Sequence, residues 1–114
     1  MKAGENFDIA DNDNILKINS PRDHVGGPFS VVYKSLNARW AIVALAWDGQ
    51  PMLGLRYFWG TAGNPCGTWA TSTWLVIPPE ITLPILNGLP LAPGYRNKLE
   101  KFLNKEIPGE ELKT

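Results

Sequence analysis

The chain has 114 residues, of which 44% are hydrophobic, 19% charged and 11% aromatic, and its 11 basic and 11 acidic residues give a formal net charge of zero. This length predicts one compact globular domain. The balanced charge argues against a protein-wide attraction to nucleic acid or to an anionic membrane, so that any site for a polyanion must be local. The longest apolar stretches, residues 40–47 and 74–79, are too short to span a bilayer, and the N-terminus lacks an apolar signal core. We therefore expect a soluble cytoplasmic protein without a membrane partner.

Side chains that support catalysis or metal binding are scarce. The chain has one cysteine, Cys66, and one histidine, His24, which excludes an intramolecular disulfide and a His-rich metal site. A nucleophile with a base would have to unite these two residues from separate segments, with no third group to orient the histidine. We predict no enzymatic activity, no cofactor and no metal site.

The two ends of the chain are predicted to lie outside the folded domain. Residues 1–24 are polar and indicate a loosely attached arm, residues 25–108 a single α+β domain, and residues 109–114 a frayed tail. Within the arm, the aspartates at 8–13 favour solvated coil, and residues 15–18 could form a short edge strand.

The middle of the chain has the composition of β-strands. Four segments rich in aromatic and β-branched residues, separated by turn residues, cover 31–33, 40–47, 53–59 and 69–77. Their short connections predict an antiparallel meander of four or five strands. The spacing of apolar residues after Pro93 predicts a C-terminal helix. The fold class is therefore α+β, with C-terminal helical segments packed on one face of the sheet.

The hairpin around Asp48-Gly49 defines the two faces of this sheet. A two-residue loop at 49–50 or a four-residue loop at 48–51 gives the same register, with Trp40 opposite Trp59 and Ile42 opposite Tyr57, whereas a three-residue loop would exchange the faces. One face is then apolar and consists of Trp40, Ile42, Ala44, Ala46, Leu53, Leu55, Tyr57 and Trp59. We expect the helical region to cover it with Leu83, Leu86, Leu99 and Phe102.

The opposite face, here called the arginine face, combines cations with aromatic rings. It consists of Arg39, Ala41, Val43, Leu45, Trp47, Met52, Gly54, Arg56 and Phe58. Guanidinium groups beside flat rings can hold phosphates while the rings stack on bases. The candidate site residues are Arg39, Trp47, Arg56 and Phe58, with Lys34 and Trp69 from the neighbouring strands. Alternatively, another subunit or the N-terminal arm covers this face. Because the helical material suffices for one face only, we also predict a homodimer.

The chain is tryptophan-rich, with five tryptophans, and this suggests a second kind of ligand. Tryptophan offers a large flat contact area and one N–H group, which also suits sugars or planar aromatic molecules. The aromatic side chains of Trp47, Tyr57, Phe58 and Trp69 would then surround a pocket closed by the loop at 60–67.

The segment WDGQPMLGLRYF at 47–58, followed by WLVIPPEI at 74–81, resembles the pattern of the transcriptional positive-coactivator family, which is whirly-like. These are small proteins whose antiparallel sheet and C-terminal helix pair as dimers and bind single-stranded DNA. The resemblance covers residues 40–86, and it implies that Arg56 matches the strand arginine of the family and Trp47 the aromatic residue before the turn. The chain also resembles orphan proteins of mobile (integron) gene cassettes, which would imply a bacterial source.

These observations predict a non-enzymatic protein that binds single-stranded nucleic acid through the arginine face, as a transcription-related dimer. The alternatives are a small-molecule or sugar-binding module, or a cassette protein that acts through protein–protein contacts.

Overall fold

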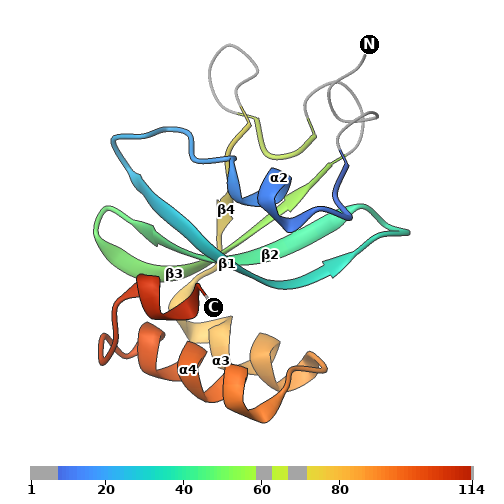
Figure 1. The fold of residues 1–114 in the computed structure, drawn as a ribbon. Coiled ribbons are helices and arrows are strands. Elements are labelled where there is room, and N and C mark those ends of the chain that lie inside the picture. The colour runs from blue at the N-terminus through green and yellow to red at the C-terminus, as the bar shows by residue number, and fades with distance from the viewer. Residues whose placement is uncertain (1–7, 59–62, 67–71, 114) are drawn as a thin grey trace.

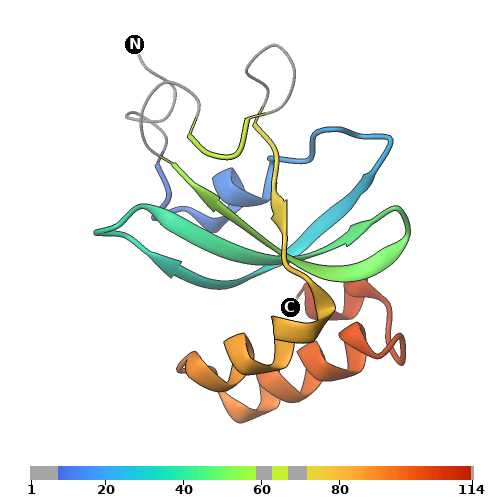
Figure 2. The ribbon, with the colours of Figure 1, turned by 180° about the vertical axis from the view of Figure 1, so that it is seen from behind.

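The computed structural model describes residues 8–58, 63–66 and 72–113, and these form an antiparallel sheet of four strands between two unequal helical layers (Figures 1 and 2). The strands are β1 (Val25–Ser35), β2 (Trp40–Trp47), β3 (Gln50–Tyr57) and β4 (Leu75–Val76). The helices are α2 (Asn12–Leu16), α3 (Pro79–Gly88), α4 (Pro93–Leu103) and the 3-10 helix η2 (Gly109–Leu112). The strands lie in the order β1-β2-β3-β4, which confirms the predicted α+β meander.

The hairpin between β2 and β3 is tighter than predicted. Its loop is Asp48-Gly49, with φ angles of 52° and 80°, which is the combination that a two-residue type I′ turn requires. Trp40 therefore pairs with Tyr57 rather than with Trp59, and Ile42 pairs with Leu55 rather than with Tyr57. The predicted register is thus wrong by two residues along β3. Because side chains alternate with a period of two, this shift leaves the assignment of residues to faces unchanged.

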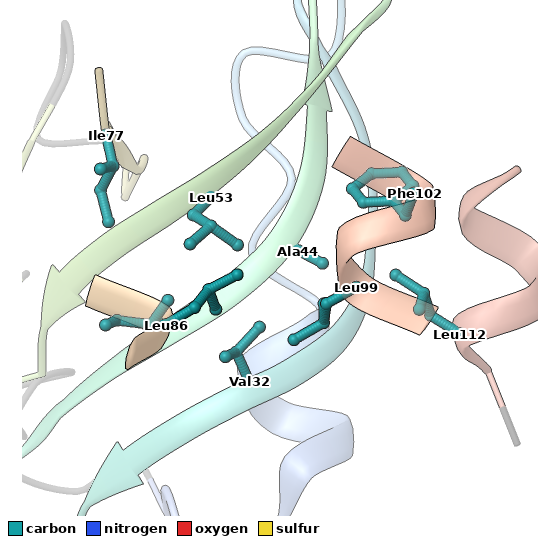
Figure 3. Close-up of a cluster of buried hydrophobic side chains, with 9 residues drawn as sticks. Val32, Ala44, Leu53, Ile77, Leu86, Leu99, Phe102 and Leu112 are labelled. Carbon is teal, nitrogen blue, oxygen red and sulfur yellow. The ribbon is translucent and has the colours of Figure 1, made fainter. Parts of the chain in front are cut away.

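The main core lies between the sheet and the C-terminal helices (Figure 3). It consists of Val32, Ile42, Ala44, Leu53, Ile77, Leu86, Leu99, Phe102 and Leu112. Helix α4 begins with Pro93 in its first turn, where a missing N–H costs nothing, and turns Leu99 and Phe102 toward the strands. Of the four helical residues predicted to cover the sheet, Leu86, Leu99 and Phe102 are buried, whereas Leu83 is 51% exposed.

A second core lies on the arginine face, and the N-terminal segment covers it. Ile9 and Ile15 are 3% and 0% exposed and pack with Val43, Leu45 and Phe58. The strand predicted for 15–18 is therefore wrong, and the coil predicted for 8–13 holds only as far as Asp11, because α2 begins at Asn12. Asp11 caps α2 by accepting a hydrogen bond from the backbone N–H of Asp13, which favours a helix at this position. Both faces of the sheet are thus covered within one chain.

The frayed end predicted after Pro108 is also wrong for the described residues. Residues 109–112 form η2, and Leu112 is 3% exposed within the main core. Gly109 lies so close to the ring of Phe29 that a Cβ atom at this position would clash with the ring. Within the described part of the chain, no helix has the length and apolar character that a membrane crossing requires.

Candidate functional site

Arg56, the central residue of the predicted site, is enclosed by its own chain. Its side chain projects from β3 into the second core, and the residue is 2% exposed. Its Nη1 donates to the carbonyl oxygens of Pro65, at 2.9 Å, and of Thr73, at 2.6 Å, and its Nη2 donates to Ser72 Oγ at 3.3 Å. Burial lowers the pKa of Arg56 to about 10, so that it still carries its charge at neutral pH. The guanidinium therefore ties two segments of the chain to the sheet.

Phe58 and the two other cations of the predicted site are also engaged within the protein. Phe58 is 2% exposed, and the guanidinium of Arg56 lies 5.0 Å from the centre of its ring. Arg39 Nε donates to the carbonyl oxygen of Phe58 at 2.7 Å. Lys34 Nζ donates to the carbonyl oxygens of Ile9 and Ala10 at 3.0 and 2.8 Å. Lys34 and Phe58 thus lie against the N-terminal segment, and Arg39 lies beside Phe58.

Trp47 lies apart from these residues, at the end of β2 beside the hairpin turn. Its ring stacks on that of His24, with 5.8 Å between ring centres and an angle of 12° between the planes. His24 Nδ1 in turn pairs with a carboxylate oxygen of Asp48, and this hydrogen bond and charge raise the pKa of His24 above its usual value. No pattern in the sequence places His24 beside Trp47, because the contact depends on how β1 pairs with β2.

The aromatic pocket proposed as an alternative is not assembled by the described residues. Tyr57 and Phe58 are neighbours in the chain and point to opposite faces, with Tyr57 38% exposed and Phe58 buried. Trp69 and half of the loop at 60–67 lie outside the described residues, as does Trp59.

A pocket of about 440 Å³ lies elsewhere, between α3, α4 and the start of β3. Six apolar side chains and three polar ones line it among the described residues: Pro51, Met52, Pro79, Leu83, Leu86 and Leu103, with Thr82, Glu100 and Asn104. Leu86 is 1% exposed, whereas Leu83 is half exposed. We call this site the helix pocket.

The polar groups of the helix pocket are partly free to bind a ligand. Thr82 Oγ1 donates to the carbonyl oxygen of Pro78 at 3.2 Å, which leaves its own lone pairs as acceptors. Glu100 forms an ion pair with Arg96 at 3.5 Å, and both side chains are partly exposed. The sequence does not single out Leu83 as a pocket residue, because α3 also exposes Ile81, which does not line the pocket.

A larger hollow of about 900 Å³ lies between α2, β1, Tyr95 of α4 and the C-terminal end of the chain. Charges of both signs line it, including those of Asp13, Lys17 and Lys113. Its two hydroxyl groups, on Ser30 and Tyr95, already bond to each other. Polar groups therefore make up a larger share of the lining of this hollow than of the helix pocket.

The described residues hold no group of three or more histidine, cysteine, aspartate or glutamate side chains that could bind a metal ion. Comparison of the chain with protein-family models, with curated proteins and with solved structures finds no match.

Proposed function

We propose that the protein is a non-enzymatic binding protein that takes a small, largely apolar molecule into the helix pocket. The observation that carries this proposal is the pocket itself, in which apolar side chains outnumber polar ones two to one. Its volume of about 440 Å³ suits a small organic ligand. Concave sites of this size, with a few polar groups to orient the ligand, are typical of small-molecule binding.

Binding of single-stranded nucleic acid through the arginine face, and the resemblance to the coactivator family, stay predictions. Ile15 and Ile9 occupy that face, so that bases could reach Phe58 only if the N-terminal segment left the sheet. Titration with a 20-nucleotide single strand at low salt tests this possibility directly. The homodimer also stays a prediction, although the uncovered face that motivated it is filled by the chain's own N-terminal segment.

The proposal is tested with 1-octanol as a neutral apolar probe, followed by the methyl NMR signals of the protein. We expect saturable shifts at Leu86, Leu103 and Met52, which line the pocket. Leu83→Asn should weaken octanol binding roughly three- to tenfold, because it removes apolar surface at the rim of the pocket.

The matched control is Ile81→Asn, because Ile81 lies on the same helix with a similar exposure, 47% against 51%, but does not line the pocket. This variant should bind octanol as the parent does. If octanol moves no pocket methyl signal, or if the two variants bind equally well, the helix pocket is not the binding site.

A further inference from the structure

We infer that the ligand of the helix pocket carries a cationic head, an ammonium group attached to an apolar tail; this inference rests on the proposed function. Glu100 is the one charged side chain among the described residues that line the pocket. The other polar lining groups, on Thr82 and Asn104, each include an oxygen that can accept a hydrogen bond. An ammonium group presents three donors and no acceptor, which complements this set.

The carboxylate of Glu100 retains the capacity to bind such a group. Its Oε1 lies 3.5 Å from Arg96 Nη2, which is longer than the 2.7–2.9 Å that is roughly usual for a charge-assisted hydrogen bond. Arg96 Nη2 also donates to Asn87 Oδ1, at the end of α3, and is therefore shared between two acceptors. No other described residue donates a hydrogen bond to the Glu100 carboxylate.

The position of Glu100 is unfavourable for helix α4 itself. The helix ends at Leu103, so the carboxylate lies in its last turn, where the partial negative charge of the helix end repels an anion. The pair also has the less favourable order, with the cation N-terminal to the anion at a spacing of four residues. An ion pair in this order and position adds little to the stability of the helix, whereas a bound cation would interact directly with the carboxylate.

The end of α4 adds to the attraction for a cation. Leu103 and Asn104, the last residue and the C-cap of the helix, both line the pocket, so that the negative end of the helix dipole faces the ligand. The nearby cations Lys101 and Lys105 are exposed and do not line the pocket. An anionic head would meet Glu100 and the helix end, and both would repel it.

Three probes with the same eight-carbon tail distinguish the contribution of the head group to affinity from that of the tail. They are octylammonium, 1-octanol and octanoate, each titrated at pH 7 by calorimetry and methyl NMR. We expect octylammonium to bind about tenfold more tightly than octanol, and octanoate more weakly than either, since a charge-assisted hydrogen bond is worth roughly one such factor. Glu100→Gln should reduce the affinity for octylammonium about tenfold and so remove its advantage over octanol.

Glu106→Gln is the matched control, because Glu106 is an exposed acid just beyond α4 that does not line the helix pocket. It should leave the affinity for all three probes unchanged. If octanol binds but octylammonium binds no better, or if Glu100→Gln has no effect on the affinity for octylammonium, the inference of a cationic head group is wrong. The proposal that the helix pocket binds a small apolar molecule is then unaffected. If none of the three probes binds, both the pocket and its head group are wrong.

Discussion

Arg56 and Glu100 are charged residues beside apolar surface, and their surroundings give them different roles. Arg56 is 2% exposed and donates to carbonyl oxygens of its own chain, which is a structural role. Glu100 keeps 40% of its side chain exposed and has one partner among the described residues, Arg96 at 3.5 Å. The sequence predicts the face of the sheet on which Arg56 lies, but not that its side chain is buried. Its acceptors are backbone carbonyls of residues 65 and 73, and a backbone acceptor leaves no signature in the sequence.

His24 is expected to make the stability of the protein depend on pH. Asp48 raises the pKa of His24 in the folded protein above its usual 6.5, through a hydrogen bond and charge attraction. The protonated form is thus favoured by folding, and its contribution is complete below pH 6.5 and lost as the pH rises through the raised value. Urea unfolding should show the parent losing stability relative to His24→Gln as the pH rises from 6 to 8.

The NMR titration of the single histidine provides the control for this prediction. Asp48→Asn removes the carboxylate but keeps a residue that favours the type I′ turn, and it should return the pKa of His24 toward its usual value. If the pKa of His24 is the same in this variant as in the parent, Asp48 is not the cause of its raised pKa.

At the scale of elements, the hairpin shows what a repeating pattern can and cannot predict. The apolar alternation assigns residues to the correct faces, but it is satisfied equally by any register that differs by two residues. The turn decides the register, and it does so because Asp48 and Gly49 both adopt positive φ angles. Asp-Gly in the sequence favours this turn, and reading it as the complete loop would have predicted the observed pairs.

The end of α4 contains a conformation that glycine would adopt more easily. Lys105 has a φ of 65° and its N–H donates to the carbonyl oxygen of Phe102, while the N–H of Glu106 donates to that of Lys101, as in a Schellman motif. We expect Lys105→Gly to raise the free energy of unfolding by about 0.5–1 kcal/mol, since it removes the strain of a side chain in the left-handed region.

Lys101→Gly is the matched control, because it makes the same change of side chain inside α4. It should lower the free energy of unfolding by about 1 kcal/mol, as glycine does in a helix interior. Chemical denaturation of the three proteins measures both effects, and a loss of stability in Lys105→Gly would contradict the assigned helix end.

At the scale of the whole molecule, the sequence predicts the parts that repeat and misses the parts that depend on distant contacts. The number and order of the strands and the helix after Pro93 follow from periodicity and turn residues, but β1 begins at Val25 rather than at 31, and β4 is Leu75–Val76 rather than 69–77. The packing of Ile9 and Ile15 against the sheet does not, because two isolated apolar residues in a polar segment give no periodic signal. The sequence does not predict the helix pocket either, because the residues that line it come from β3, α3 and α4, which are separate segments of the chain.

The N-terminal segment should therefore behave as part of the core rather than as an arm. Ile15 is 0% exposed and lies among Val43, Leu45 and Phe58, so that Ile15→Ala removes buried methyl groups from a packed site. We expect it to lower the free energy of unfolding by about 2–4 kcal/mol. Ile81→Ala makes the same change at a side chain that is 47% exposed and should cost about 0.5 kcal/mol. Equal losses in the two variants, measured by urea unfolding, would show that Ile15 belongs to a loose arm, as the sequence predicts for residues 1–24.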